Sequence, residues 1–576
     1  MMLINRQSEA QKKIAELYGD LNRRAGASPF GSCPVELTAA FVRMCLAQSC
    51  GKCVPCRVGL SRLVEILERI LDGAGSAADI DLIRETAQAI YDSADCAIGF
   101  EAARMVLDGL AAFEDDYKSH IEKGICTAKF GSVPCQTGCP AHVNIPGYIA
   151  CIGAGRYADA VRVIRQTNPF PAVCGLICEH PCEKYCRRNV VDDAINIRGL
   201  KRYAVEKAGD VPAPECAPKN GKTVGIIGGG PAGLTAAYFL ALRGFEVTVY
   251  EKRPKLGGML RYGIPAYRLP DADLDRDINV ILSTGVKVEF GKTVGKDISF
   301  ADFRKKFDAV YISIGAHGAK KLGIEGEDAK GVLSAVELLG ATGAGERPDF
   351  TGKRVVIVGG GNVAMDATRT AKRLGAKSVT CVYRRRIVDM TALPEEVAGA
   401  QAEGCEVLQL MAPVRVATQD GAVTGLVVKP QIAGAIKGGR PAPVNSTAPE
   451  ETIPCDIIVA AIGQRVDDAG LDLKAEGVFV GGDCYTGPAT VIRAIDAGRV
   501  AAENIGGPWA GDPVEIPAAS AGQRLHWGRV NMQERAAEER KGDFNLMEKC
   551  LTDEEAAQEC SRCLRCDHCG FGAFRK

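Results

Sequence analysis

Closely spaced cysteines are the residues with the clearest chemistry in this 576-residue sequence. Cys50, Cys53 and Cys56, in SCGKCVPCR, place three thiolates within about two helical turns. This spacing suits three corners of a [4Fe–4S] cube and leaves a fourth ligand to come from elsewhere in the chain. Zinc is the competing interpretation, because four thiolates also satisfy its tetrahedral preference.

A second set of six cysteines follows, and its spacing predicts iron–sulfur chemistry without fixing how many clusters are present. Six thiolates exceed the four that one cube needs. A single cluster, or two clusters with a non-cysteine ligand, are both open, and Cys126 is the only nearby cysteine upstream of PCQTGCP and VCGLICEHPCEKYC. The six candidate ligands are Cys135, Cys139, Cys174, Cys178, Cys182 and Cys186.

The third set is an uninterrupted CxxCxxCxxC near the end of the sequence. It resembles half of a bacterial ferredoxin motif but lacks the proline that usually follows the last cysteine. We expect a cluster here, with zinc or a site completed by a partner protein as the alternatives. The ligands are Cys560, Cys563, Cys566 and Cys569. We expect eight other cysteines to be small buried apolar residues without a role: Cys33, Cys45, Cys151, Cys216, Cys381, Cys405, Cys455 and Cys484.

A glycine-rich turn directly after the apolar run TVGII predicts a dinucleotide site. Glycines in this context let backbone amides approach a pyrophosphate at a helix N-terminus. Glu251 closes the next apolar run, VTVYEK, about 20 residues on, where a carboxylate accepts hydrogen bonds from ribose hydroxyls. The predicted binding residues of the turn are Gly228, Gly230, Pro231, Ala232 and Gly233.

A second glycine-rich turn follows RVVIV, with alanine at the third glycine position as the fingerprint permits. It lacks the acid that an NAD site would have. Arg384 and Arg385 stand there instead, and arginine pairs with the 2′-phosphate of NADP whereas a carboxylate repels it. The sequence therefore predicts NADP(H) at Gly359, Gly361, Asn362, Val363 and Ala364.

The elements that position these residues alternate between β-branched runs and helical segments, which predicts an α/β fold with two Rossmann-like, three-layer domains built on parallel sheets. We expect two helical iron–sulfur domains before them, the first with an apolar stripe formed by Leu60, Leu63, Val64, Leu67, Ile70 and Leu71. VPAPECAPKNGK reads as a linker. Thr552 and Glu555 predict a capping box ahead of the last cysteines. The expected domains are 1–122, 123–215, 216–340 with 465–510 (FAD), 341–464 (NADP) and a tail at 511–576.

Composition limits the classes of partner. Lysine plus arginine and aspartate plus glutamate are balanced at 71 each, so there is no net field to attract nucleic acid or an anionic membrane. The polar N-terminus lacks the features of a secretory signal, and no run of about 18 apolar residues predicts a membrane span. We expect a cytoplasmic protein.

The order GIIGGGPAGL, VVIVGGGNVAMDA with VYRR, and GVFVGGDCYTGPATVIRAIDAGR resembles the glutamate synthase small-subunit family over about residues 123–510. The resemblance implies FAD at the first site, NADPH at the second, and contact of Asp483 with the flavin ribityl chain. It implies further flavin contacts from Ala461, Ile462, Gly463 and Gln464, and FAD-site roles for Lys252, Gly258, Gly315, Gly482 and Thr490. NADPH-dependent dihydropyrimidine dehydrogenase and bifurcating transhydrogenases share these motifs.

Residues 34–110 resemble the iron–sulfur domain of the NADH-binding flavoprotein subunit of respiratory complex I. The resemblance implies that Cys96, in DCAIGFEA, is the fourth ligand beside SCGKCVPCR. The upstream domain that binds FMN and NADH in that family is missing here, so its NADH-oxidising activity does not carry over.

Together these features predict a subunit that exchanges hydride between NADP(H) and FAD and relays single electrons through two to four [4Fe–4S] clusters. No acid or base is needed, so we nominate no catalytic side chain. We expect a NADH/ferredoxin:NADP transhydrogenase, with electron bifurcation as one form of it, whose partners are an NADH-oxidising flavoprotein, a thioredoxin-like [2Fe–2S] subunit and ferredoxin. The alternatives are the small subunit of glutamate synthase and a non-enzymatic electron-transfer scaffold.

Overall fold

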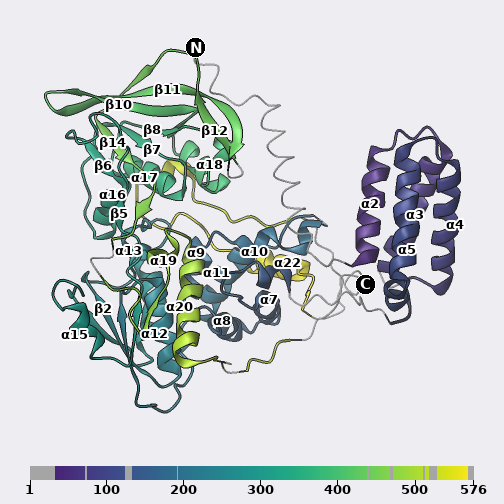
Figure 1. Ribbon diagram of the computed structural model, residues 1–576, viewed down its shortest axis with the longest axis horizontal. Helices are drawn as coiled ribbons and strands as arrows, with labels where there is room; N and C mark the ends of the chain where they lie inside the picture. The colour runs from purple at the N-terminus through teal and green to yellow at the C-terminus, as the bar shows by residue number, and fades with distance from the viewer. Residues whose placement is uncertain are drawn as a thin grey trace.

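The computed structural model describes residues 33–71, 74–123, 133–190, 192–437, 440–467, 471–509, 511, 513–517 and 528–567 (Figure 1). Two cysteines considered above, Cys126 and Cys569, lie outside these ranges. No helix within them is both long and apolar enough to cross a membrane.

The first described domain is helical, as predicted, and has its own hydrophobic core (Figure 1). Its elements are α2 (Pro34–Gln48), a π-helix η1 (Pro55–Leu60), α3 (Ser61–Leu71), α4 (Ala77–Ser93) and α5 (Ala97–Lys123). The predicted apolar stripe is confirmed, because Leu60, Leu63, Leu67, Ile70 and Leu71 are buried and Val64 packs against the same core.

The second helical domain carries the densest cysteines on short helices. These are α6 (Pro134–Thr137), α7 (Ile145–Gly153), α8 (Tyr157–Arg165), α9 (Pro171–Ile177), α10 (Pro181–Lys184), η2 (Arg187–Val190) and α11 (Ile197–Ala208). The segment 211–222, which was predicted to be a linker, contains no helix or strand.

The first nucleotide-binding domain is a parallel sheet in the order β16-β4-β1-β2-β3. Its strands are β1 (Thr223–Ile227), β2 (Glu246–Glu251), β3 (Lys287–Phe290), β4 (Ala309–Ile312) and β16 (Val478–Val480). The helices are α12 (Pro231–Leu242), α13 (Met259–Tyr262), α14 (Asp271–Leu282), α15 (Phe300–Arg304), α19 (Asp483–Thr486) and α20 (Val491–Gly506). The small pair β5 (Gly318–Ala319) and β15 (Gln464–Arg465) connects the two nucleotide-binding domains.

The second nucleotide-binding domain is a parallel sheet in the order β6-β14-β7-β8-β9. Its elements are β6 (Val332–Ser334), α16 (Ala335–Gly343), β7 (Arg354–Val358), α17 (Asn362–Arg373), β8 (Ser378–Tyr383), η3 (Ile387–Asp389), α18 (Pro394–Ala402), β9 (Glu406–Gln409) and β14 (Ile457–Ala460). The strand β6 belongs to this sheet although it precedes residue 341. The α/β class with two parallel Rossmann-like sheets is confirmed.

An antiparallel sheet that the sequence did not predict is inserted into this second domain (Figure 1). It consists of β10 (Met411–Gln419), β11 (Ala422–Lys437), β12 (Arg440–Asn445) and β13 (Glu451–Pro454). Strand β11 pairs antiparallel with β10, β12 and β13 without an intervening helix, so this sheet lacks the strand–glycine–helix pattern that identifies a nucleotide-binding unit.

One hydrophobic core joins the second helical domain to the first nucleotide-binding domain. Helix α9 packs on α14, and the backbone N–H of Val173 donates to the Asp277 carboxylate at 3.0 Å. Burial raises the pKa of Asp277 to about 7. The cysteine-bearing helices and the first sheet therefore form one packed unit, in which movement of one part displaces the other.

The C-terminal segment crosses this unit and then the second nucleotide-binding domain. It contains α21 (Ala537–Arg540) and α22 (Asp553–Arg562), and the predicted capping box of Thr552 with Glu555 is confirmed. The yellow ribbon of α22 lies over α7 and α11 (Figure 1).

A buried carboxylate joins the C-terminal segment to the second domain. Glu403 is fully buried and accepts from Arg369 and Arg373 at 2.6 Å each and from Arg540 at 2.8 Å. Burial disfavours its ionised form, but the guanidiniums outweigh this effect and hold the pKa of Glu403 at about 2. Arg373 also lies over the ring of Tyr267, 3.9 Å from its centroid.

We expect Glu403→Gln to lower the free energy of unfolding by about 3–5 kcal/mol, because it leaves buried guanidiniums without a countercharge. Urea unfolding followed by circular dichroism measures the change. Glu450→Gln removes the carboxylate from the exposed pair with Arg415 and is the matched control. That control should change stability by less than about 1 kcal/mol. Equal effects of the two variants would contradict the structural role of Glu403.

Candidate functional site

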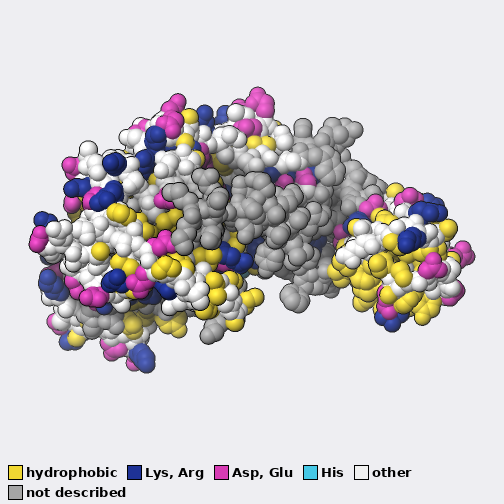
Figure 2. Space-filling view, turned by 90° about the horizontal axis from the view of Figure 1, so that it is seen from above, with side chains coloured by type: hydrophobic (Ala, Val, Ile, Leu, Met, Phe, Trp, Pro, Cys, Tyr) yellow, Lys and Arg dark blue, Asp and Glu magenta, His cyan; other side chains and the backbone are white. Residues whose placement is uncertain are grey.

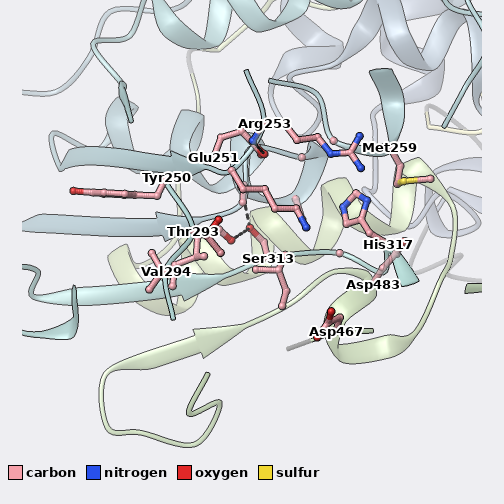
Figure 3. Close-up of a pocket in the computed structure, with 18 of the residues that line it drawn as sticks. Tyr250, Glu251, Arg253, Met259, Thr293, Val294, Ser313, His317, Asp467 and Asp483 are labelled. Atoms are coloured by element: carbon pink, nitrogen blue, oxygen red, sulfur yellow. Dashed lines mark hydrogen bonds between the residues drawn. The ribbon is translucent and has the colours of Figure 1, made fainter. Parts of the chain in front are cut away.

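The first glycine-rich turn opens onto a cavity of about 250 Å³ at the carboxyl ends of β1, β2 and β4 (Figure 3). The lining contains nine of the residues predicted for this site: Gly228, Gly230, Pro231, Ala232, Glu251, Lys252, Gly258, Gly315 and Asp483. It does not include Gly233, Gly463, Gln464, Gly482 or Thr490. This position, outside the strand ends, is where doubly wound sheets bind nucleotides.

Gly233 and Gly230 have different structural roles in this turn. A Cβ at Gly233 would lie 2.0 Å from the Gly228 carbonyl oxygen, so Gly233 permits close packing of α12 on β1. A Cβ at Gly230 would meet nothing closer than Gly258 Cα at 3.9 Å. The space above Gly230 is therefore open at the N-terminus of α12, where backbone N–H groups favour an anion. This open space fits the pyrophosphate of a dinucleotide.

Two carboxylates face this cavity from opposite sides. Glu251 is held at the end of β2, where its two oxygens accept from the backbone N–H groups of Gly229 and Arg253 at 2.8 Å each. Asp483 begins α19 and accepts from the Ala489 N–H at 3.2 Å. Burial raises the pKa of Asp483 to about 6. These positions suit a ribose and a ribityl chain, respectively.

His317 is a lining residue that the sequence analysis missed, because it belongs to no recognised motif. Burial, followed by the charges of Arg253 and Lys252, lowers its pKa to about 4, so the ring is neutral at pH 7. Its Nδ1 is buried without a hydrogen-bond partner among the described residues. Figure 3 shows His317 near Arg253, whose guanidinium lies 4.1 Å from the ring centroid of Tyr262.

The second glycine-rich turn has the same form at the N-terminus of α17. A Cβ at Gly359 would lie 2.4 Å from the Ala461 carbonyl oxygen, so this position requires glycine. Gly361 is the N-cap, Val363 is partly exposed in the first turn and Ala364 is buried. Asn362 points across the domain boundary: its Nδ2 donates to Glu179 at 2.6 Å, and its Oδ1 accepts from the Leu393 N–H at 2.9 Å.

Three consecutive arginines follow β8, and they differ in their surroundings. Arg384 is exposed. The Arg385 Nε donates to the Pro441 carbonyl at 2.9 Å, which fixes its stem. Arg386 forms an ion pair with Asp389 at 2.8 Å. Arg384 and Arg385 thus have no carboxylate partner in the described ion pairs, whereas Arg386 has one.

The first cysteine set lies at the surface of the N-terminal domain. Cys53 and Cys56 flank the start of the π-helix, a helix type frequent at functional sites. Burial and the neighbouring thiols of Cys53 and Cys96 raise the pKa of Cys56 to about 11. Cys96, which precedes α5, is therefore close to Cys56, as the predicted fourth ligand would be. Cys50 and Cys96 are exposed, so the site opens to solvent.

In the second helical domain, four cysteines lie close enough to the buried Lys201 to affect its charge. Burial disfavours the charged form of Lys201, but these thiols raise its pKa. A hydrogen bond from Cys174, with a smaller contribution from the charge of Lys201, outweighs burial and lowers the pKa of Cys178 to about 6. The four cysteines are Cys139, Cys174, Cys178 and Cys182.

The other two candidate ligands of this domain, Cys135 and Cys186, line a neighbouring cavity together with Cys563 and Cys566 of the C-terminal segment. Within the described ranges, no three or more His, Cys, Asp or Glu side chains are placed so that they could hold a single metal ion. A [4Fe–4S] cube has a different requirement, because each of its thiolates binds a different iron at a different corner.

Three family models match consecutive parts of the chain. The iron–sulfur binding region of NADH-ubiquinone oxidoreductase F matches residues 36–120. The 4Fe-4S cluster domain II of dihydropyrimidine dehydrogenase matches 121–211, and the pyridine nucleotide-disulphide oxidoreductase model matches 222–498.

Whole proteins of similar sequence are oxidoreductase subunits. The beta subunit of NADP(+)-dependent formate dehydrogenase from Moorella thermoacetica is 34% identical over 93% of this chain and 91% of that protein. The beta subunit of NADPH-Fe(3+) oxidoreductase from Geobacter sulfurreducens (strain DL-1 / KN400) is 36% identical over 91% and 89%. The small chain of glutamate synthase [NADPH] from Escherichia coli (strain K12) is 33% identical over 65% and 88%.

Because the space above Gly230 is open, Gly230→Val should place methyl groups where a pyrophosphate would lie and should yield folded, FAD-free protein. Absorbance at 450 nm per mole of protein measures flavin occupancy. Gly542→Val adds the same side chain at another uncrowded position outside the site and should keep its flavin. A fully flavinated Gly230→Val variant would show that the site is misplaced.

Proposed function

We propose a function for this chain from its family: it belongs to the family of NADP(H)-dependent flavin and iron–sulfur oxidoreductase subunits that includes the three relatives described above. We propose that it exchanges hydride between NADP(H) and FAD and relays single electrons through [4Fe–4S] clusters to partner subunits. When bound, a flavin accepts two electrons as hydride and releases them one at a time, which suits cluster relay.

A single contact carries this proposal. Glu179 follows Cys178 directly in the chain, and it accepts the 2.6 Å hydrogen bond from Asn362 at the start of the second fingerprint helix. The His180 Nε2 lies 3.9 Å from a carboxylate oxygen of Glu395, which belongs to the same nucleotide-binding domain as Asn362. The cysteine-bearing loop thus touches the predicted coenzyme turn, and the continuous core holds that loop against the first sheet. Coenzyme, flavin and clusters would therefore lie within one packed region.

The side chains named above would act by binding and orientation. The Gly228–Gly233 turn and α12 would hold the FAD pyrophosphate, Glu251 the ribose and Asp483 the ribityl chain. The turn at Gly359 would hold the NADP(H) pyrophosphate, with Arg384 and Arg385 at the 2′-phosphate. His317 is neutral at pH 7 and carries an unpartnered nitrogen, so it would add a hydrogen bond without adding charge.

The electron partner is proposed from the N-terminal domain. Its Cys50 and Cys96 are exposed, as are Val54 and Val58, and Figure 2 shows hydrophobic side chains gathered on this domain. Such a surface suits electron exchange with another subunit. We propose a transhydrogenase-type complex with an NADH-oxidising flavoprotein, a thioredoxin-like [2Fe–2S] subunit or ferredoxin.

A role as the small chain of glutamate synthase is less well supported. The match to the Escherichia coli small chain covers 65% of this chain, whereas the two beta subunits match more than 90% of it. About a third of the chain thus lacks a counterpart in that small chain. If the protein were the small chain of glutamate synthase, the cysteine motifs near both ends of the sequence would need a separate explanation.

Replacing both Arg384 and Arg385 with Ser should weaken NADPH binding about tenfold to a hundredfold, because a charge-assisted hydrogen bond contributes roughly 1.5–3 kcal/mol. NADH lacks the 2′-phosphate and should be almost unaffected. Anaerobic stopped-flow reduction of the bound flavin by each coenzyme measures the difference and tests the proposed activity.

Arg386→Ser is the matched control, since Asp389 already pairs with that guanidinium. It should leave the NADPH dependence unchanged. Equal losses for NADPH and NADH in the double variant would mean that the two arginines only support the fold. A wild-type preference for NADH would overturn the coenzyme assignment.

Lys201 should raise the reduction potential of the cluster held by the four surrounding cysteines, because its ammonium stabilises the added negative charge. Lys201→Gln should therefore shift one cluster potential to a more negative value in an EPR-monitored redox titration. Lys207→Gln, at the exposed end of the same helix, should shift none. Unchanged potentials in Lys201→Gln would show that no cluster lies beside this lysine.

A further inference from the structure

The C-terminal helix α22 is fixed to the loop that follows Cys186. Glu559 is fully buried, and its two oxygens accept from the backbone N–H groups of Asn196 and Val530 at 2.7 Å each. Arg562, also fully buried, donates to Glu559 at 2.6 Å and to the Asp193 carbonyl at 2.6 Å. Breaking this buried ion pair would leave an uncompensated charge away from water. The pair therefore fixes the position of the last turn of α22.

Directly after this turn, Cys563 and Cys566 line one cavity with Cys135 and Cys186. Arg565 adopts a positive φ of 50° between them, which turns the chain back toward that cavity. Burial raises the pKa of Cys563 to about 11, with the Cys186 thiol adding to the effect. Burial, followed by the thiols of Cys186, Cys566 and Cys563, raises the pKa of Cys135.

Cys560 belongs to the same sequence motif but lies elsewhere. It sits on α22 and packs against α7, where a Cβ at Gly153 would be 3.7 Å from its own Cβ. Burial raises the pKa of Cys560, and among the described cysteines only Cys563 contributes to this shift. The CxxCxxCxxC pattern is thus divided between two environments.

We propose that Cys135, Cys186, Cys563 and Cys566 bind one [4Fe–4S] cluster, so that the C-terminal segment completes a cluster begun by the second helical domain. This inference rests on the proposed function, which requires clusters in that domain. The six candidate ligands of the domain and these two cysteines supply eight thiolates. Cys139, Cys174, Cys178 and Cys182 then hold a second, adjacent cluster with a full set of cysteines.

The surroundings of the cavity suit a bound anionic cluster. Arg187 lowers the pKa of Cys566 against the larger effect of burial, which raises it to about 12. Arg562 acts in the same direction on Cys186, where burial again dominates and raises the pKa. Without iron, burial keeps these groups protonated as neutral thiols. Iron binding would replace the four protons, and the two guanidiniums would offset the negative charge of the resulting cluster.

The test compares anaerobically purified full-length variants. Cys135→Ala and Cys563→Ala should each lose about four irons per chain and the same EPR signal, given four irons in each cube. The double variant should lose no more iron than either single variant. Cys560→Ala, the matched control, should keep that signal. Loss of the signal in Cys560→Ala together with its retention in Cys135→Ala would overturn the proposal.

Two further measurements separate the possible failures. Reduction of bound FAD by NADPH, recorded on the same samples, reports the proposed function and folding independently of the cluster. When a chelator removes iron from the wild-type protein, Cys135 and Cys563 should become available to iodoacetamide together, as the iron is lost. Modification of Cys563 while the iron content is still complete would also overturn the proposal.

Discussion

A thiolate buried away from water is unfavourable unless a metal or a cation neutralises it, and this constraint governs the centre of the molecule. The second helical domain buries most of its cysteines, and each buried group lies beside positive charge. Lys201 lies among one set, and Arg187 and Arg562 act on the other. Bound iron–sulfur clusters would satisfy this constraint.

Buried carboxylates are subject to the same constraint, and two of them hold the C-terminal segment in place. The C-terminal segment is joined to the second nucleotide-binding domain at Glu403 and to the cysteine loop at Glu559, both fully buried. Each of these carboxylates is neutralised by arginine from another part of the chain or from the same helix turn. The segment therefore links the second nucleotide-binding domain to the second helical domain through buried contacts.

Sequence reasoning predicted the elements whose signals are local. Both glycine turns, Glu251 at the end of β2, the capping box at Thr552 and the closeness of Cys96 to Cys56 can be read from spacing or from resemblance. Contacts between distant segments could not be read in this way. Nothing in the spacing indicates that Asn362 meets Glu179, or that a lysine in an ordinary helix lies among four thiols. From their spacing alone, the cysteines of the C-terminal motif are expected to bind one local cluster. Spacing does not show that α22 ends between Cys560 and Cys563.

One packed region would bring a flavin site together with two adjacent clusters, one of them completed by the C-terminal segment. An anomalous difference map at the iron absorption edge, from crystals of anaerobically purified protein, would locate these clusters. We expect one iron peak between Cys135, Cys186, Cys563 and Cys566, and a second beside Lys201. An iron peak at Cys560, with no peak between Cys135 and Cys186, would contradict this arrangement.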